Sequence, residues 1–302
     1  MPAPSSSPFH FTPLRYPGGK GKLVSFVRGV LTDNGLIGGT YVEPYAGGAA
    51  IAIELLLTEY VSEVHLNDIS KPIFAFWHSI LDDTEAFLRR LRDTPCTPAT
   101  WHRQKEILKG ERRGTQLDLG FATFFLNRTN RSGVLNAGMI GGHEQLGPWK
   151  IDARYNRKDL AKRIELIASK RQRIHLSNND AIYFLSRVYD ALPEKTLIYF
   201  DPPYFQKGRQ LYYDYYRQRD HEMIAKFICE RLKKHHWMVS YDNVPQVRRL
   251  YVGSPMLTYS ISYSARQAGT GREAMFFSPA LRVPHVAGAM FDARRYRMLA
   301  SV

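Results

Sequence analysis

The chain has few cysteines and no long apolar run, and each shortage excludes a class of protein. Only Cys96 and Cys229 occur among the 302 residues, too few for a disulfide framework or a cysteine zinc site. No apolar run approaches the length that crosses a bilayer. Residues 1–12 lack the charged and apolar regions of a signal peptide, so we expect a short flexible tail there and a cytoplasmic protein.

Acidic residues are also in short supply. The 28 Asp and Glu stand against 42 Lys and Arg, which gives a formal net charge of +14. Between Lys71 and Arg173 there are 20 basic and 11 acidic residues, so this third of the chain holds +9 of that excess. Scattered surface lysines would give the same total, but the concentration in one region favours a polyanionic partner such as nucleic acid.

Short apolar segments alternate with helical patterns along most of the chain. Residues 39–60 predict a strand, a glycine turn at Gly47 and Gly48, and an apolar helix. Further strands are expected at 62–68, 173–177, 196–200 and 236–242, with a closing strand pair at 256–263 and 274–278. This alternation predicts an α/β fold: a Rossmann-like, mostly parallel sheet with helices on both faces and an antiparallel edge.

One long stretch departs from the alternation. Residues 82–120 are highly charged and helical in pattern, and residues 127–156 are rich in Gly and Asn without a clean period, as in a loop or hairpin. We therefore predict a mostly helical insert over 71–170. The α/β domain would be formed by 13–70 and 171–285, and a basic tail would follow over 286–302.

Marked positions follow four of the predicted strands: the turn after Tyr45, then Asp68, Asp180 and Asp201. A single acid after a strand is usually a helix cap. Four such positions predict one cofactor cleft, because ligands of open α/β sheets bind at the carboxyl ends of the strands. The segment 15–23, RYPGGKGKL, lacks the spacing of a phosphate-binding P-loop and precedes the first strand, so we reject that function.

The strand at 196–200 ends in the sequence Asp201-Pro202-Pro203-Tyr204. Two successive prolines remove two backbone donors and fix two φ angles, so the chain is held rigidly after the strand. A turn requires neither a carboxylate before the prolines nor an aromatic ring after them. This surplus indicates a chemical role for the motif.

Five segments, in this order, resemble the Dam family of DNA adenine-N6 methyltransferases: RYPGGK (15–20), YVEPYAGGAA (41–50), LND (66–68), NND (178–180) and DPPY (201–204). Residues 124–133 with 150–156 are similar to that family's target-recognition insert, and 270–278 to its closing strand. The resemblance covers about residues 13–280. It implies a class I methyltransferase fold that uses S-adenosylmethionine and methylates double-stranded DNA.

The resemblance also implies roles for individual residues. Tyr16 and Lys20 would contact the cofactor, and the turn from Pro44 to Gly47 would lie against its methionine part. Asp68 would accept the two ribose hydroxyls, and its placement after a strand suits that function. Asp180 would lie near the cofactor's adenine, and Asp201 near both the methyl group and the target amine.

The chemistry of the reaction agrees with these roles. Adenine N6 is a poor nucleophile because its lone pair is delocalised into the ring, so a site must hold both N–H groups with acceptors. An ionised Asp201 is one acceptor and the Pro202 carbonyl a second. Tyr204 offers a ring face to a base that has left the duplex. The methyl donor is already activated, so the enzyme needs alignment and no covalent intermediate.

Several residues are candidates for DNA contact. Residues 207–219 interleave four tyrosines with basic residues, and Tyr212 and Tyr215 would serve base stacking there, unless these rings pack on the core. Arg128, Arg131 and Arg154 in the insert are expected to contact DNA. We expect a monomer or weak dimer, with a cognate restriction nuclease as a further partner.

Other functions share parts of this pattern. The target amine could belong to cytosine N4, RNA or a protein glutamine, or the chain could be an inactive DNA-binding relative. A cytosine-C5 enzyme needs a nucleophilic cysteine, and Pro95-Cys96 lies between helical segments, away from any strand end. No histidine spacing indicates a metal site, so no metal is expected.

Overall fold

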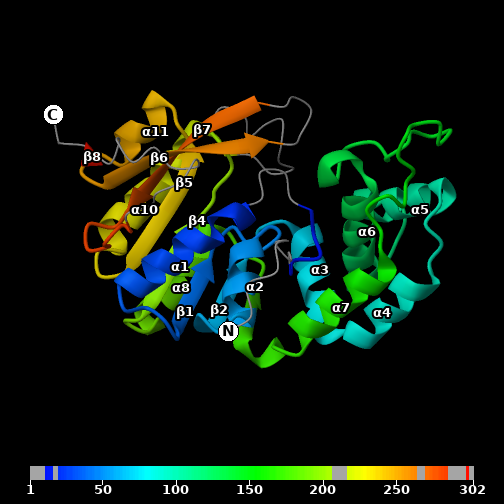
Figure 1. Ribbon diagram of the computed structural model, residues 1–302, viewed down its shortest axis with the longest axis horizontal. Coiled ribbons are helices and arrows are strands. Elements are labelled where there is room, and N and C mark those ends of the chain that lie inside the picture. Colours follow the sequence, from blue (N-terminus) through cyan, green and yellow to red (C-terminus); the bar gives the residue numbers. More distant parts are fainter. Residues whose placement is uncertain (1–10, 16–19, 206–215, 264–268, 285–296, 299–302) are drawn as a thin grey trace, which may run out of the picture.

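The computed structural model describes residues 11–15, 20–205, 216–263, 269–284 and 297–298 (Figure 1). An eight-stranded sheet in the order β3-β2-β1-β4-β5-β7-β6-β8 forms its centre. The strands are β1 (Gly39–Glu43), β2 (Val61–Asn67), β3 (Ile174–Ser177), β4 (Thr196–Phe200), β5 (His236–Asp242), β6 (Pro255–Tyr263), β7 (Gly269–Phe277) and β8 (Arg297–Met298). The predicted tails, residues 1–12 and 286–302, lie almost wholly outside the described residues.

The first five strands of the chain pair in parallel, and β7 is antiparallel to both β5 and β6. This confirms the predicted α/β class with an antiparallel edge. From β1 the chain moves outward to β2 and β3, and from β4 it moves the opposite way to β5. The strand order therefore reverses between β1 and β4, and ligands of open α/β sheets bind outside the strand ends at such a point.

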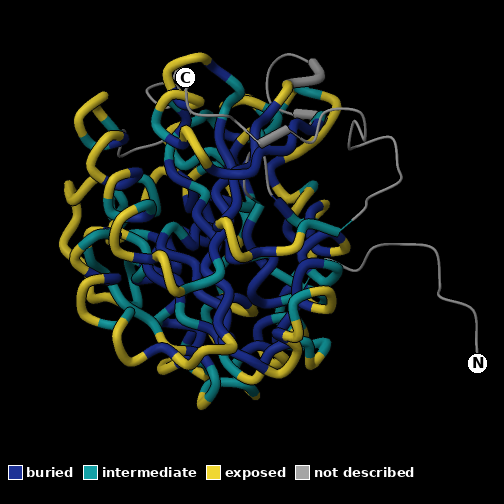
Figure 2. Tube along the Cα trace, turned by 90° about the vertical axis from the view of Figure 1, so that its left-hand side faces the viewer, coloured by how far each residue is buried: buried dark blue, intermediate teal, exposed yellow. Residues whose placement is uncertain are grey.

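Helices cover both faces of the sheet. One apolar core includes side chains of α1 (Val24–Asp33), α2 (Ala50–Leu57) and α3 (Lys71–Asp82). A second core, on the other face, includes side chains of α8 (Ala181–Val188), α10 (Gln218–Arg231) and α11 (Pro245–Leu250). All five residues of both β1 and β4 are buried, as expected of central parallel strands that are covered on both faces. Figure 2 shows these buried segments at the centre of the molecule.

A group of helices lies to one side of the sheet (Figure 1). It consists of α3, α4 (Thr84–Asp93), α5 (Pro98–Lys109), α6 (Gln116–Thr129) and α7 (Arg157–Ala168). Phe76 of α3 stacks on Phe124 of α6 with ring centroids 6.0 Å apart. Gly120 allows this approach, because a Cβ there would meet the Ala75 carbonyl oxygen at 2.4 Å. The predicted insert boundaries fall at the start of α3 and just after α7, and the division into domains remains a prediction because the first core continues into these helices.

Two boundaries differ from the sequence-based prediction. The predicted loop from residue 127 begins later, because α6 continues through Thr129 and only then gives way to turns and an isolated bridge between Asn130 and Met139. Strand β7 begins at Gly269 rather than at residue 274, because Gly269 to Glu273 pair with the end of β6. The extra residues of β7 are therefore in strand conformation because they pair with β6.

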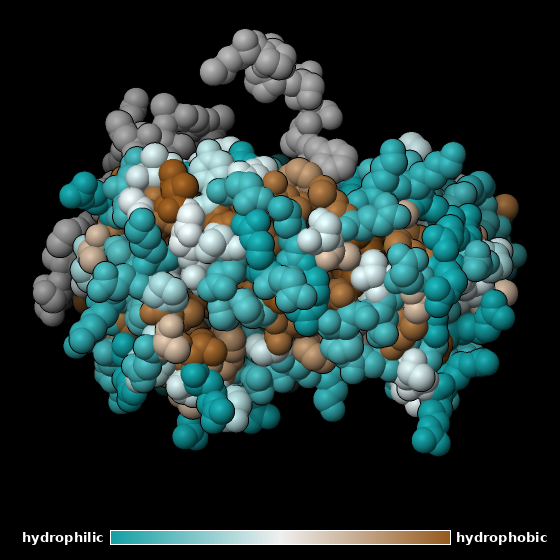
Figure 3. All heavy atoms as spheres, turned by 90° about the horizontal axis from the view of Figure 1, so that it is seen from below, coloured by the Kyte–Doolittle hydropathy of each residue, from teal (hydrophilic) through white to brown (hydrophobic). Residues whose placement is uncertain are grey.

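The described residues contain no helix long and apolar enough to cross a membrane. Seen from below, the molecule is covered mostly by hydrophilic residues, with smaller apolar patches between them (Figure 3).

Candidate active site

The glycine turn after β1 is held from two sides. From the end of β2, Asp68 accepts the Gly47 N–H through Oδ2 at 2.8 Å and the Ser70 N–H through Oδ1 at 2.9 Å. From α3, Trp77 Nε1 donates to the Gly47 carbonyl oxygen at 2.9 Å. Gly47 has a φ of 48°, a left-handed conformation that favours glycine. The N–H and the carbonyl oxygen of Gly47 are thus both held in place near the switch point of the sheet, where the strand order reverses between β1 and β4.

Asn67, which precedes Asp68, ties three strand ends together. Its amide is completely buried and makes four hydrogen bonds. Nδ2 donates to the carbonyl oxygens of Pro44 (3.0 Å) and Asn179 (2.9 Å), while Oδ1 accepts from the Ser177 hydroxyl (2.8 Å) and the Asn179 N–H (3.0 Å). An amide can make about this many bonds, so the side chain is fully used. The segments after β1, β2 and β3 therefore keep one relative position.

Asp180 caps a helix, as a single acid after a strand commonly does. Its Oδ1 accepts the N–H groups of Ile182 (2.9 Å) and Tyr183 (3.2 Å) at the start of α8. Asp180 also lines a cavity of about 430 Å³ with Tyr183, Ser186 and Tyr216. Cofactor pockets commonly measure about 300–1,000 Å³. Capping and cofactor contact are therefore compatible at this position.

Two large apolar side chains remain exposed beside these acids. Ile69, directly after Asp68, is 50% exposed, and Tyr183 of α8 is 56% exposed. Asn178 joins the two strand ends, because its Nδ2 donates to the carbonyl oxygens of Asp68 (2.6 Å) and Ile69 (3.0 Å). Apolar surface next to strand-end carboxylates suits a ligand that has a flat ring at one end and hydroxyls nearby.

Asp201, which follows β4, is held by hydrogen bonds from β5 and from the N-terminal segment. Its Oδ1 accepts the Ser240 hydroxyl at 2.9 Å and lies 3.4 Å from Lys20 Nζ. Ser240 is itself 2.8 Å from the Tyr199 hydroxyl. The Asp201 side chain keeps 24% of its surface exposed, against 6% for Lys20. Contacts to Ser240 and Lys20 therefore orient the Asp201 carboxylate, while part of it stays accessible to solvent.

Lys20 joins Asp201 to a second, deeper acid. Its Nζ lies 2.6 Å from Oε2 of Glu273 on β7 and 3.2 Å from the Tyr204 hydroxyl. The hydroxyls of Tyr204 and Tyr259 both donate to the Glu273 carboxylate. Only 1% of Glu273 is exposed. One ammonium, two carboxylates and two phenols thus form a continuous buried network.

The network shifts the pKa values of its members. Burial alone would lower the pKa of Lys20, but Asp201 and Glu273 together raise it. Burial alone would raise the pKa of Glu273, but Lys20 and the tyrosine hydroxyls lower it. Burial raises the pKa of Asp201, against Lys20 and with the help of Glu273. Glu273 is therefore the carboxylate that stays ionised more readily, and Asp201 is the one that takes up a proton more readily.

Glu43 on β1 is a third acid behind the site. Burial raises its pKa to about 8, against a hydrogen bond from the Ala52 N–H, and the charge of Asp201 adds to the rise. Near neutral pH this carboxyl therefore holds its proton, so Glu43 adds no negative charge to the network of Lys20, Asp201 and Glu273.

Tyr204 differs from its predicted arrangement. The sequence predicted a ring face open to a base, but the side chain is 3% exposed and its hydroxyl is bonded to Glu273. The aromatic residue after the two prolines thus turns inward to the network. The sequence could not show this, because the partner acid lies 69 residues away.

The N-terminal segment lies between the glycine turn and the helical part. The Thr12 hydroxyl donates to the Gly48 carbonyl oxygen at 2.5 Å. Three residues on, the backbone of Arg15 exchanges two 2.7 Å hydrogen bonds with the buried Asn127 amide at the end of α6. The RYPGGK segment therefore starts from a clamped position, and its Lys20 ends in the Asp201 network.

Four arginines gather at this junction: Arg15, Arg128, Arg154 and Arg163. Arg128 is half-buried, and its Nε donates to the Arg154 carbonyl oxygen at 2.7 Å. Burial lowers the pKa of Arg128 to about 9, and Arg15 and Arg163 contribute to the fall. Arg154 is exposed and lies over the Trp149 ring, with 5.9 Å between guanidinium carbon and centroid. Arg131 is also exposed.

The structure brings most of the predicted site residues into two adjoining groups. Pro44, Gly47 and Asp68 lie together at the glycine turn, and Lys20, Asp201 and Tyr204 share the buried network. Tyr16, Tyr212 and Tyr215 lie outside the described residues. Tyr216, next to them, places its hydroxyl 2.7 Å from that of Tyr45 in the glycine turn.

Sequence reasoning missed four residues of these groups: Glu43, Asn67, Ser240 and Glu273. Glu43 carried a signal as the acid that ends the buried strand β1, and Glu273 carried a weaker one as the single acid in β7. Such an acid is costly to bury unless it is protonated or paired. Asn67 and Ser240 carried none, because their importance comes from partners on other strands.

The polar groups converge where the strand order reverses, so the fold is one that binds a nucleotide-type cofactor between the two halves of its sheet. Comparison with protein families assigns it further. The chain belongs to the D12 class N6 adenine-specific DNA methyltransferase family, which it matches over residues 16–267. The protein is thus a methyltransferase, and family and fold imply S-adenosylmethionine as its methyl donor.

Solved structures also resemble the chain, at low identity. A proposed RNA methyltransferase of Pyrococcus horikoshii is 11% identical, with 90% of each chain covered and a TM-score of 0.41. An rRNA methyltransferase of Streptomyces viridochromogenes is 11% identical, with 88% of this chain and 86% of that chain covered and a TM-score of 0.34. No curated protein matches the chain.

Proposed function

We propose that the protein transfers a methyl group to the N6 amine of adenine in double-stranded DNA. The observation that carries the proposal is the state of Asp201. It is an acceptor at the switch point of the sheet, oriented from behind by Ser240 and Lys20 and open in front. An aligned acceptor is what an exocyclic amine needs as it gains a new bond.

The strand ends beside Asp201 fit S-adenosylmethionine. When bound, this molecule supplies a methyl group on a positively charged sulfur. The turn from Pro44 to Gly47 and the side chains of Tyr16 and Lys20 would hold its amino-acid end. Asp68, whose carboxylate accepts the Gly47 and Ser70 N–H groups, would also accept the ribose hydroxyls.

The ring end of the cofactor would lie against exposed apolar surface. Ile69 and Tyr183 are exposed on either side of the joined strand ends, and Asp180 lies at the cavity between α8 and Tyr216. Covering these side chains would remove apolar area from water, which stabilises binding. This surface supports the assignment of Asp180 to the adenine part of the cofactor.

Asp201 and Pro202 would act on the target amine. Asp201 Oδ1 is engaged by Ser240 and Lys20, so Oδ2 would accept one N6–H and the Pro202 carbonyl the other. N6 would form its bond to the methyl carbon as the bond between that carbon and the donor sulfur breaks, and the amine must then lose one proton. A carboxylate whose pKa is raised is the better acceptor for that proton, and burial raises the pKa of Asp201.

Tyr204 would then be a positioning residue for the network. Its hydroxyl contacts both Glu273 and Lys20, and Lys20 in turn contacts Asp201. A stacking surface for a flipped base must come from other rings or from movement of this one. Tyr212 and Tyr215 remain our candidates for base stacking beside the site.

DNA would bind across the arginine junction. Arg154 and Arg131 are exposed, and Arg128 has a guanidinium crowded by other arginines. A phosphate would relieve this repulsion, and helices α3–α7 belong to the region that holds most of the chain's positive excess. The proposal places the duplex at the junction, with the target base turned towards Asp201. A restriction–modification setting with a cognate nuclease remains a prediction.

The test is single-turnover transfer of labelled methyl from S-adenosylmethionine to duplex DNA, followed by nucleoside mass spectrometry of the product. We expect N6-methyladenine from the wild-type protein and no transfer from Asp201→Ala. Asp201→Asn keeps a carbonyl acceptor and should retain more activity than Asp201→Ala. Thermal melting and S-adenosylmethionine titration of each variant control for folding and for cofactor affinity.

Each other product contradicts a different part of the proposal. N4-methylcytosine would change the target base, and methylation of RNA but not DNA would change the substrate. An active Asp201→Ala variant would remove Asp201 from the chemistry. Cofactor binding without methylation of any nucleic acid would identify an inactive relative or a protein methyltransferase.

A further inference from the structure

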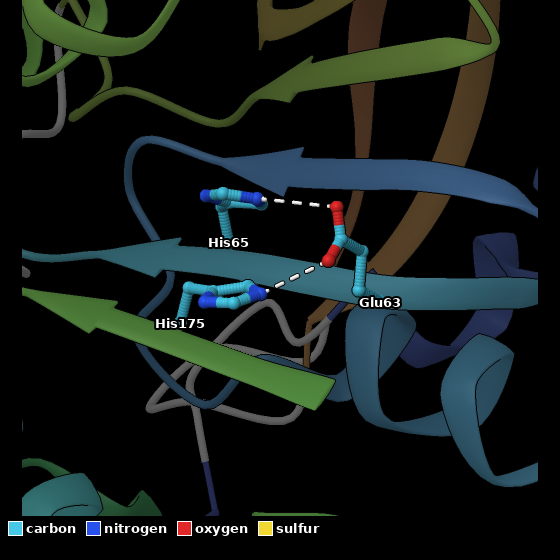
Figure 4. A group of neighbouring side chains, drawn as sticks. All are labelled: Glu63, His65 and His175. Carbon is cyan, nitrogen blue, oxygen red and sulfur yellow. Dashed lines mark hydrogen bonds and ion pairs between the residues drawn. The ribbon is translucent and has the colours of Figure 1, made fainter. Parts of the chain in front are cut away.

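A second group of polar side chains lies on β2 and β3, outside the proposed active site. Glu63 and His65 are two residues apart on β2, so they point to the same face of the sheet. His175 on β3 pairs in register with His65, and the two rings stack with centroids 4.4 Å apart. Figure 4 shows both imidazoles directed towards the Glu63 carboxylate.

The ligand atoms of this group have the separations of a metal site. Nε2 of His175 lies 3.0 Å from Glu63 Oε2, and Nε2 of His65 lies 3.6 Å from Oε1. Two ligands in a tetrahedral site, each about 2.0–2.1 Å from a zinc ion, are separated by about 3.3 Å. The three ligand atoms all lie within 4.8 Å of one another, so a shared ion requires only small side-chain movements.

The protein also orients the carboxylate from behind. The Thr40 hydroxyl on β1 donates to Glu63 Oε1 at 3.0 Å. Hydrogen bonds of this kind fix ligand orientation in metal sites. The His175 side chain keeps 48% of its surface exposed and Glu63 33%, so an ion and its waters can enter from solvent.

The donor set selects a class of ion. Two imidazoles and one carboxylate suit zinc and its first-row neighbours, whereas magnesium and calcium prefer sites made of oxygen atoms. Imidazole must be neutral to coordinate, and its ordinary pKa of about 6.5 leaves it neutral above pH 7.

We propose that Glu63, His65 and His175 bind a divalent first-row transition-metal ion such as Zn²⁺, with water completing its coordination. The ion joins β3, a four-residue edge strand, to β2. Two positions further along the same strands, Asn67 pairs with Ser177, and their side chains are hydrogen-bonded at 2.8 Å. The ion therefore reinforces the strand pair from which the Asp68 and Asp180 segments leave the sheet.

The site does not rest on the proposed methyltransferase chemistry, and its test uses binding and stability alone. Tag-free, metal-free protein is titrated with Zn²⁺ by calorimetry and with Co²⁺ by visible absorption at pH 7.5. We expect one equivalent to bind, and the Co²⁺ bands to report a site with nitrogen and oxygen ligands. Zn²⁺ should raise the melting temperature, and Mg²⁺ at the same concentration should not.

Single substitutions assign the ligands. His175→Ala and Glu63→Gln should each weaken Zn²⁺ binding by at least about tenfold and abolish the thermal shift. His175→Asp supplies another ligand atom and should bind more tightly than His175→Ala. His78→Gln is the matched control, because His78 on α3 is a surface histidine beside a carboxylate, Asp82, at 3.7 Å.

Two results would overturn the proposal. One is the absence of saturable Zn²⁺ and Co²⁺ binding by folded wild-type protein. The other is binding that survives in both His175→Ala and His65→Gln, which would place the ion at other residues. Since His175 is half exposed, His175→Ala is expected to fold, and circular dichroism of the metal-free variants verifies this.

Discussion

Lys20, at the carboxyl end of the sheet, is flanked by two carboxylates, whereas Arg128, at the junction with the helical part, is flanked by other arginines. The two regions are joined by the short segment that starts at Arg15. In the first, the ammonium lies 2.6 Å from Glu273 and 3.4 Å from Asp201. In the second, the guanidinium of Arg128 is held mainly by backbone carbonyl oxygens of Pro13 and Arg154.

Under the proposed function, this difference would separate a site for chemistry from a surface for DNA binding. Opposite charges that neutralise one another hold Asp201 in one orientation, and reaction geometry requires that rigidity. Like charges held by carbonyl dipoles keep their positive potential, which attracts a polyanion from a distance. Two basic residues, Lys20 and Arg128, would thus serve different functions, according to the partners that the fold brings to them.

The largest expected effect is the loss of Glu273. Glu273→Ala leaves Lys20 with one carboxylate and deprives two tyrosine hydroxyls of their acceptor. Breaking a buried pair in this way typically costs about 3–5 kcal/mol, so the free energy of unfolding in urea should fall by about that amount. Methyl transfer should fall as well, because Lys20 also orients Asp201.

Glu111→Ala is the matched control for Glu273. Glu111 forms an exposed pair with Lys109 at 3.3 Å, and exposed pairs contribute little to stability. Equal unfolding free energies for the two variants would show that the buried network stabilises no more than a surface pair, and the comparison of the two regions would lose its basis.

Glu43 adds a third case to the comparison of Lys20 with Arg128, because this buried acid is neutralised by a proton and not by a cation. Its pKa is raised from 4.5 to about 8, so the unfolded chain releases this proton at lower pH than the folded protein. The contribution of Glu43 to stability is therefore greatest below about pH 4.5 and is lost as the pH rises towards 8. Glu43→Gln should remove this loss, and the variant should gain on the wild type by about 1.4 kcal/mol per pH unit.

Urea unfolding of both proteins at pH 5.5, 6.5 and 7.5 measures this difference. A difference that stays constant over the three pH values would mean that Glu43 ionises normally in the folded protein.

Tyr204 and Tyr259 test the role of the network in orienting Asp201. Each hydroxyl donates to Glu273, and hydrogen bonds to charged groups are worth about 1.5–3 kcal/mol. We expect similar losses of stability in Tyr204→Phe and Tyr259→Phe. Tyr204 also contacts Lys20, which orients Asp201, so the Tyr204→Phe variant should lose more activity in single-turnover methyl transfer. Equal activity of the Tyr204→Phe and Tyr259→Phe variants would mean that the Tyr204 hydroxyl has only a structural role.

The smallest expected effects concern the arginine junction. Neutralising Arg128, Arg131 and Arg154 one at a time should weaken DNA binding modestly, and each lost phosphate contact should reduce the slope of log affinity against log salt by about 0.9. Fluorescence anisotropy with duplex DNA at several salt concentrations measures both. Arg92→Gln, a neutralisation of an exposed arginine on α4, is the control. Unchanged affinity and slope in all three variants would exclude the junction as the DNA surface.

Much of the fold could be predicted because local sequence carries its own period. Buried runs such as 196–200 and the helical pattern after Gly47 indicated strands and helices within a few residues of their observed limits. Helix boundaries also depend on local sequence, as where Thr115 and Asp118 form a capping box at the start of α6. The start of β7 was wrong, because its first residues are polar and glycine-rich and become a strand only by pairing with β6.

In the candidate site, too, residues in local motifs could be predicted, and contacts between distant residues could not. Asp201, Gly47 and Asp68 could be selected from the sequence, because each follows a predicted strand and has a chemical reason for its residue type. Lys20 was selected through the family resemblance of its segment. Glu273 and Lys20 are 253 residues apart, so no local pattern could join them. The inward turn of Tyr204 and the four hydrogen bonds of Asn67 were hidden for the same reason.

The sequence by itself determined the alternating elements, the acids at the strand ends, the rigid turn after Asp201 and the positive charge of the helical region. All of these depend on neighbours within a few positions, or on composition alone. Tertiary structure alone decided which acid Lys20 pairs with, which arginines meet at the junction, and that Glu63, His65 and His175 share one face of the sheet. Those outcomes depend on strand order and register, which bring together side chains from distant parts of the chain, and burial then sets their pKa values and hydrogen bonds.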